Sequence, residues 1–322
     1  MRQSGRALVC AAVLVASVLG EPQAADAGDP SVVSASSADV SRCHLDRADF
    51  TAVGDCRLVV EDDSLAADPV PRWGSIDCED PTRHRRRAGS DDPHPTALGV
   101  TDGNDFWRQL EVRDGDDYYG ERCELGRNEH RDGEQGTFTL YQPGTRRITF
   151  FSLLLPSRFD LATQRWQVVA QMKQANPSDL AESGTDYGYS PILEMNARDG
   201  RWEAHNNWNL IWQAPARKST WVRFAVDVYY SPDPNQGWIR FFVDLNGDGD
   251  ALDQYEAAPA IHTDTLKTEI PDPNGEENDE DGIPAGAAIP SHLRLGIYHD
   301  PEIQCQPACR VRVDNVQVLA PD

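Results

Sequence analysis

A series of short segments with strand periodicity, separated by turn-forming pairs such as Asp-Gly and Asn-Gly, constrains the fold most. Long stretches with the 3.6-residue period of an amphipathic helix are absent from the sequence. We therefore expect an all-β protein, a β-sandwich or jelly roll built from antiparallel sheets. The segments with alternating or continuous apolar residues are 148–155, 166–173, 191–197, 221–230, 238–245, 293–298 and 311–319.

The N-terminal segment has the features of a secretory signal peptide. Arg2 and Arg6 precede an apolar stretch, which is too short to span a bilayer with margin, and Ala25-Asp26-Ala27 supplies a small-residue cleavage pattern. Cys10 lies inside the apolar stretch after Val9, so we expect release rather than a lipid anchor. We predict a signal peptide at 1–27, a flexible lead at 28–40 and a single domain at 41–322, and thus a secreted protein.

Removal of that segment would take away Cys10 and leave six of the seven cysteines. An even number of cysteines in an exported chain implies disulfides. We predict the pairs Cys305–Cys309, Cys43–Cys56 and Cys78–Cys123. A zinc site is the competing interpretation, and it is weak because the chain has no Cys-x-x-Cys pair and its histidines lack ligand spacing.

The charge balance restricts the partners. The chain has 30 Lys and Arg against 53 Asp and Glu, a formal net charge of -23. Phosphate binding needs clustered cations, so nucleic acid and anionic membranes are unsuitable partners. We interpret the one basic run, at 83–87, as a solvated loop, and the acidic segment 270–284 as a mobile loop. We expect a monomer.

Three predicted strands present long polar side chains on one face, because alternate residues of a strand point the same way. We place Trp166, Val168, Ala170 and Met172 on one face of their strand, and Gln167, Val169, Gln171 and Lys173 on the other. On the remaining two strands the polar sets are His292, Arg294 and Tyr298, and Arg122 with Glu124. Gln, Arg, Tyr and Lys on neighbouring faces indicate the floor of a groove, and an ordinary solvated sheet face is the alternative.

Three motifs resemble the signature strands of the jelly-roll polysaccharide lyases, a group that includes alginate lyases, heparin lyase I and glucuronan lyase. They are Arg122-Cys123-Glu124-Leu125, Gln171-Met172-Lys173, and the run from Leu293 to Asp300. The resemblance covers about residues 100–319. It implies a concanavalin-like jelly roll with a concave substrate groove, and β-elimination at a uronic acid of an acidic polysaccharide, with no required cofactor.

The resemblance also implies roles for individual residues. Arg122 and Gln171 would hold the substrate carboxylate, since an Arg fork suits it and an amide can stabilise an enolate. Tyr298 would be the acid and also a candidate base, with a cation nearby to lower its pKa. Glu124 would orient Arg122, and Arg294 and His292 would contact substrate.

This sequence departs from the family pattern at two positions. Lys173 stands where the motif Gln-x-His has histidine, so it would bind substrate or assist Tyr298 rather than act as base. Gly126 stands where the family has a second arginine. If a histidine base is required, His130 is the first candidate, followed by His205 and His292.

Two further groups are candidates for binding. Trp208 and Trp212 lie among Asn and Gln residues, and their rings are candidates for sugar stacking. Asp244, Asn246, Asp248 and Asp250 resemble a calcium loop, although the position of the usual bidentate Glu is Tyr255. An acidic hairpin without calcium is the alternative.

Three other functions stay open. A non-catalytic carbohydrate-binding jelly roll is supported by the departures at Lys173 and Gly126. A glycoside hydrolase would need a pair of carboxylates across the groove, for which Glu124 and Glu194 are the evident candidates. A purely structural protein would have no need of Gln171 and Tyr298 on groove faces.

Overall fold

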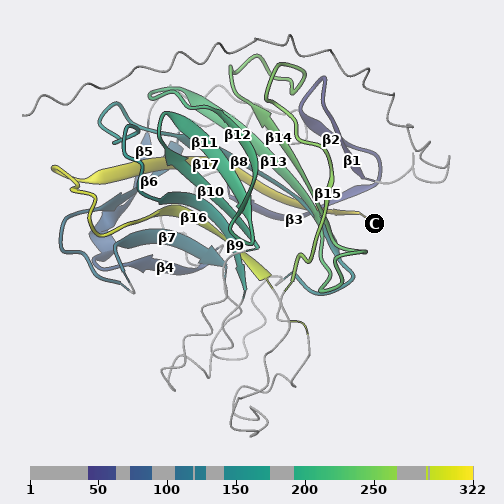
Figure 1. Cartoon of the computed structure of the whole chain (residues 1–322), viewed down its shortest axis with the longest axis horizontal. Coiled ribbons are helices and arrows are strands. Elements are labelled where there is room, and N and C mark those ends of the chain that lie inside the picture. The colour runs from purple at the N-terminus through teal and green to yellow at the C-terminus, as the bar shows by residue number, and fades with distance from the viewer. Residues whose placement is uncertain are drawn as a thin grey trace, which may run out of the picture. The chain divides into compact units, whose positions relative to one another are not determined.

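A computed structural model describes residues 43–62, 73–88, 106–118, 120–127, 141–174, 192–266, 288 and 291–321 (Figure 1). All of the described residues belong to one compact unit within 40–322. The predicted signal peptide, the flexible lead, the acidic segment 270–284 and His130 lie outside the described residues. No helix in the described ranges has the length and apolar character needed to cross a bilayer.

Antiparallel strands in two large sheets make up the fold, which confirms the all-β jelly-roll prediction. One sheet has seven strands in the order β12 (Asn209–Pro215), β11 (Arg201–Asn206), β10 (Leu193–Arg198), β9 (Gln167–Gln174), β16 (Ser291–His299), β7 (Arg122–Arg127) and β4 (Gly74–Cys78). The second sheet has the order β15 (Ile261–His262), β14 (Trp238–Asp244), β13 (Trp221–Tyr229), β8 (Arg146–Leu154), β17 (Cys309–Pro321), β6 (Phe106–Val112) and β5 (His84–Ala88), with β3 (Cys56–Asp62) paired to β17. A small ribbon joins β1 (His44–Asp46) to β2 (Thr51–Val53), and a 3-10 turn, η1 (Pro81–Arg83), lies between β4 and β5 in the sequence.

The hydrophobic core draws its side chains from both large sheets. Phe224 of β13 stacks on Phe151 of β8 with ring centroids 5.4 Å apart, and Trp202 of β11 meets Phe224 edge-on at 5.3 Å. Buried aromatic rings contribute large apolar areas and favour these geometries. The two sheets are thus joined by side chains that the alternating pattern places inward.

The basic run at 83–87 is not the solvated loop that we expected. Its residues end η1 and form β5, which pairs with β6 at the edge of its sheet. Arg83 forms a bidentate ion pair with Asp116, at 2.8 and 2.9 Å, and the Arg86 guanidinium lies 3.6 Å from the centroid of the Phe106 ring. The ion pair and the cation–π contact hold these arginine side chains in place, whereas a run of cations without such contacts would favour a solvated loop.

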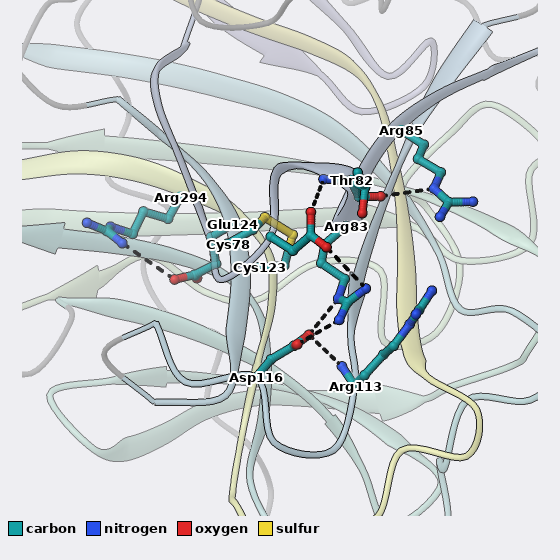
Figure 2. The surroundings of a disulfide bond; sticks show 10 residues. Cys78, Thr82, Arg83, Arg85, Arg113, Asp116, Cys123, Glu124 and Arg294 are labelled. Atoms are coloured by element: carbon teal, nitrogen blue, oxygen red, sulfur yellow. Dashed lines mark hydrogen bonds and ion pairs between the residues drawn. A yellow bond between two sulfur atoms is a disulfide. The ribbon is translucent and has the colours of Figure 1, made fainter.

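The three predicted disulfides are confirmed: Cys43–Cys56, Cys78–Cys123 and Cys305–Cys309. Cys78 and Cys123 are direct partners in the pairing of β4 with β7. Figure 2 shows this bridge and, nearby, Asp116, which accepts from the Arg83 guanidinium and from the backbone N–H of Arg113. The bridge ties the edge strand of the seven-stranded sheet to its neighbour.

The predicted faces of β9 hold only in its second half. Gln171 and Met172 point as expected, because Gln171 is opposite Arg294 and Met172 joins the core. Val168 pairs with Tyr298, whereas Val169 belongs to the core, so the expected positions of Val168 and Val169 are wrong. The cause is a β-bulge, since the register of β9 shifts against both neighbouring strands.

Candidate active site

The three signature strands are direct neighbours in the seven-stranded sheet, in the order β9, β16, β7. On the face away from the core, Arg122 lies opposite Tyr298, Gly126 opposite Arg294, and Arg294 opposite Gln171. His292 and Lys173 form the next cross-strand pair of this face. Cross-strand neighbours lie within about 4.5–5.5 Å at Cβ. Three of the predicted catalytic residues, Tyr298, Arg122 and Gln171, thus lie on one polar face. Lys173 lies beside His292, toward the other end of β16 from Tyr298.

Glu124 is the centre of the site, and its side chain is fully buried. Gln171 donates from Nε2 to Glu124 Oε1 at 2.6 Å. The other carboxylate oxygen, Oε2, lies 3.8 Å from Arg122 Nη1 and 3.6 Å from Arg294 Nη1. A buried carboxylate requires such partners, because an unpaired buried charge is costly. Glu124 therefore positions three side chains, not only Arg122 as the sequence indicated.

Tyr298 is held in place through its aromatic ring. The Arg122 guanidinium lies 4.0 Å from the ring centroid, and Trp166 packs edge-on at 4.7 Å. A Cβ on Gly120 would stand 3.1 Å from Tyr298 Cε2, so glycine leaves room for the ring. The half-buried Tyr298 donates no hydrogen bond from its hydroxyl to a described residue. A fixed ring with an available hydroxyl suits proton transfer.

Asp77 of β4 belongs to the site, although the sequence did not single it out. Its Oδ2 lies 2.5 Å from Arg294 Nη1, and Asp77 is the cross-strand partner of Glu124. A signal did exist: a bridge between Cys78 and Cys123 in direct register places Asp77 opposite Glu124. Two carboxylates therefore hold the guanidinium of Arg294.

His292 is buried, and it supports a neighbouring side chain rather than offering an exposed surface. Arg294 Nε donates to His292 Nε2 at 2.9 Å, so the imidazole accepts at this nitrogen. Burial, together with the cations of Arg294 and Lys173, lowers the pKa of His292 well below its usual value. The neutral ring carries its proton on Nδ1, which is buried and has no hydrogen-bond partner among the residues that the structure describes. His292 thus fixes one side of Arg294.

The glycine at 126 is explained by its neighbours. A Cβ there would stand 2.5 Å from Ser75 Oγ, and Cζ of Arg294 would lie 3.9 Å from it. The guanidinium of Arg294 therefore lies close above Gly126, where the family motif has its second arginine. The guanidinium of Arg294, which comes from β16, thus supplies a positive charge near the position where this sequence has Gly126 in place of the second arginine.

The polar face continues onto β10 and β11. Glu194 is the cross-strand neighbour of Gln171, and Asn196 donates to Glu194 Oε1 at 2.5 Å. Burial raises the pKa of Glu194, and the Asn196 hydrogen bond opposes that rise. On β11, His205 Nε2 lies 3.0 Å from Glu203 Oε2, so this histidine is engaged by a carboxylate.

The two tryptophans predicted to contact sugar have different positions. Trp208 lies at the turn between β11 and β12 and is 70% exposed. The prediction for Trp212 is wrong, because this side chain faces the core. Its ring packs on Phe241 at 4.7 Å, and its Nε1 donates to Tyr255 O at 2.6 Å.

The calcium-loop residues form hydrogen bonds within their own loop. Asp244 accepts the backbone N–H groups of Gly247 and Gly249, at 2.7 and 3.1 Å. Asn246 directs its amide nitrogen, rather than its oxygen, to Asp248 Oδ2 at 2.8 Å. A calcium ion needs oxygen ligands, so this arrangement resembles a hydrogen-bonded acidic hairpin more than a cation site.

The solved structures that are similar to this chain include lyases and a glycoside hydrolase domain. An endo-β-1,4-glucuronan lyase from the fungus Trichoderma reesei is 13% identical, with 76% of this chain and 90% of that chain covered and a TM-score of 0.48. An alginate lyase from Corynebacterium sp. is 12% identical, with coverages of 66% and 77% and a TM-score of 0.39. A glycoside hydrolase family 131 catalytic domain from Coprinopsis cinerea is 11% identical, with coverages of 83% and 83% and a TM-score of 0.38.

No curated protein matches the chain significantly. A family model described as polysaccharide lyase matches residues 88–316, which span all three signature strands and most of the chain. The match includes Arg122, Gln171, Arg294 and Tyr298, the residues that meet on one face of the sheet. The chain belongs to the polysaccharide lyase family.

Proposed function

We propose that this polysaccharide lyase is secreted and cleaves a uronic-acid-containing polysaccharide by β-elimination. The observation that carries the proposal is the convergence of Arg122, Arg294, Gln171 and Tyr298 on three adjacent strands. Export is supported by the basic and apolar N-terminal segment together with three disulfides.

The substrate carboxylate is the group that these cations would bind. Arg294 uses Nη1 and Nε for Asp77 and His292, and its Nη2 has no partner among the described residues. Gln171 gives one amide hydrogen to Glu124 and retains a second. Both donors serve a carboxylate whose charge increases as the adjacent ring carbon loses its proton.

Tyr298 is proposed as both base and acid. Its phenolate, with the Arg122 guanidinium over the ring, takes the proton from the carbon next to the carboxylate. The electron pair forms a carbon–carbon double bond and expels the glycosidic oxygen, which receives the same proton from the Tyr298 hydroxyl. His292 cannot compete as base at Nε2, because that nitrogen already accepts from Arg294.

The hydrolase alternative is disfavoured by Glu124. A retaining or inverting hydrolase needs two carboxyl groups that reach the sugar. Glu124 is fully buried and is held by Gln171 and the two arginines, so it is not placed to exchange protons with a substrate. Trp208, exposed at one end of the polar sheet, is proposed to stack on a sugar ring outside the reacting unit.

Ultraviolet absorbance during incubation with polyglucuronate, alginate and heparin tests the proposal. A rise reports the unsaturated sugar of β-elimination. Tyr298→Phe should lower the rate by at least about 10²-fold, which is the usual contribution of a general acid–base group. Tyr229→Phe, which alters a half-buried tyrosine in the other sheet, is the matched control and should retain activity.

Two outcomes would contradict the proposal. New reducing ends without an absorbance rise would indicate a hydrolase. A flat trace on every polymer, with one polymer retarding the protein in an affinity gel, would indicate a binding module.

A further inference from the structure

The polar face of the seven-stranded sheet extends unequally on the two sides of the catalytic strands. Beyond β7 the described sheet has the single strand β4, whereas β10, β11 and β12 follow one another beyond β9. Glu194 lies opposite Gln171, and His205 lies opposite Glu194. Leu210 of the edge strand β12 is the next partner in this line. A polymer that is held at Arg294 and Gln171 therefore has its longer path over Glu194 and His205.

The part of this face over β10 and β11 carries acidic side chains whose neighbouring cations are already engaged. Glu203 points away from the core, because its chain neighbours Trp202 and Ala204 join the core. Arg198 Nε donates to Glu203 Oε2 at 2.8 Å, and His205 Nε2 lies 3.0 Å from the same oxygen. The catalytic strands thus present arginines to a ligand, whereas β10 and β11 present carboxylates.

Glu194 is the buried member of this acidic part, with 8% of its surface exposed. Asn196 donates to Oε1 at 2.5 Å, and Oε2 accepts no hydrogen bond from a described residue. Burial raises the pKa of Glu194, the Asn196 hydrogen bond opposes the rise, and the nearby charge of Glu124 adds to it. A hydroxyl donor would stabilise such a carboxylate, since hydrogen bonds to charged acceptors are strong. A second anion beside it would be repelled, because salt screens buried charges weakly.

We propose that Glu194 forms a subsite that binds hydroxyl groups of the sugar unit next to the reacting uronate and excludes an anionic substituent there. The inference rests on the proposed function, which holds the reacting carboxylate at Arg294 and Gln171. Neighbouring strands are about 4.7–4.9 Å apart, so a group bound over β10 lies one strand spacing from Gln171 and directly over Glu194.

The reacting carboxylate and a second anion would meet different surroundings. Arg122 and Arg294 offset the charge of the first, whereas an anion over β10 would face the carboxylate of Glu194. The substrate class that fits is therefore an unsulfated polyuronate, or a polymer in which uronate alternates with an uncharged sugar. A polyuronate fits when the unit next to the reacting one turns its hydroxyl edge, rather than its carboxylate, toward the sheet.

Kinetics on matched polymers test the subsite. Polyglucuronate and alginate are each compared with their chemically sulfated forms by ultraviolet absorbance. Wild type should prefer the unsulfated form, and Glu194→Gln should reduce that preference by at least about 10-fold in kcat/KM, because it removes the charge and keeps the size. Asp55→Asn removes one charge from an exposed residue between β2 and β3, and it should keep the wild-type ratio. An equal ratio in wild type and Glu194→Gln would overturn the subsite and leave the lyase proposal intact.

An affinity gel separates the subsite from the chemistry. Tyr298→Phe, which should bind without cleaving, is compared with Tyr298→Phe/Glu194→Gln in gels that contain the same polymers. The sulfated forms should retard the double variant at concentrations about 10-fold lower than the single variant requires. A flat absorbance trace together with this shift in the gel would support the subsite and contradict the proposed function. Equal retardation of the two variants by each sulfated form, or no retardation of either variant by any of the polymers, would overturn the subsite.

Discussion

The two faces of the seven-stranded sheet are buried to a similar degree by different chemistry. On the inner face, Leu125, Leu295 and Met172 join the hydrophobic core. On the outer face, Glu124, Gln171 and Arg294 are also buried, but they contact one another through hydrogen bonds and ion pairs. Apolar burial is favourable by itself, whereas a buried polar network roughly offsets its desolvation cost at best. The outer face therefore indicates a function rather than a second core.

The largest effect is expected from removal of the central carboxylate. Glu124→Ala should lower the free energy of unfolding by about 3–5 kcal/mol, because it leaves buried cations without their partner. The matched inner-face change, Leu125→Ala, should cost about 2–5 kcal/mol through a cavity. Urea unfolding measures both. Activity per folded molecule should be lost only in Glu124→Ala. If Glu124→Ala lowers the free energy of unfolding by less than about 1 kcal/mol, the central role of Glu124 is contradicted.

A smaller effect is expected from filling the space beneath Arg294. Gly126→Ala places a methyl group 2.5 Å from Ser75 Oγ, so it should cost about 1–3 kcal/mol and displace the guanidinium. Ser75→Ala removes the oxygen that clashes. The double variant should recover most of the stability in thermal or urea unfolding. If the stability losses of the two single variants add up in the double variant, the added methyl group does not clash with Ser75 Oγ.

The acid sensitivity of the outer face is expected to depend on His292. Its folded pKa is below its unfolded value of about 6.5, so its neutral form stabilises the fold above that pH. As pH falls below about 6.5, the unfolded chain binds the proton first and stability decreases by up to about 1.4 kcal/mol per pH unit. His292→Gln should flatten this slope in urea unfolding between pH 7 and pH 5. The exposed His262→Gln is the control and should leave the slope unchanged.

The smallest effect is expected at the acidic hairpin. Asp244 and Glu256 already bind backbone N–H groups of their own loop. Neither chelator nor added calcium should shift the melting temperature or the lyase rate. A ligand at 100 times its Kd stabilises by about 2.7 kcal/mol, so a rise of that size with calcium would restore the calcium-loop interpretation.

Much of this architecture is predictable because strand alternation and turn pairs are local properties of the sequence. The motifs around Arg122, Gln171 and Tyr298 are short, and their order along the chain suffices to place them together once the family resemblance is seen. The disulfide pairs follow from cysteine count and proximity. What alternation cannot show is a change of register: the bulge in β9 exchanges the faces of Val168 and Val169 without any local sign.

Contacts between distant segments account for the other differences. Trp212 stands in a polar stretch, yet strand alternation turns it inward onto Phe241. The competing zinc interpretation of the cysteines fails, because all six are joined in disulfides.

The covalent link between Cys78 and Cys123 has a consequence for motion. Edge strands are the part of a sheet that opens most readily, and β4 is an edge strand that carries Asp77. The bridge prevents β4 from separating from β7 at the position next to Asp77. Amide hydrogens around Asp77 should therefore exchange with solvent as slowly as those of interior strands, and the carboxylate should stay beside Arg294 through the local fluctuations that release other edges.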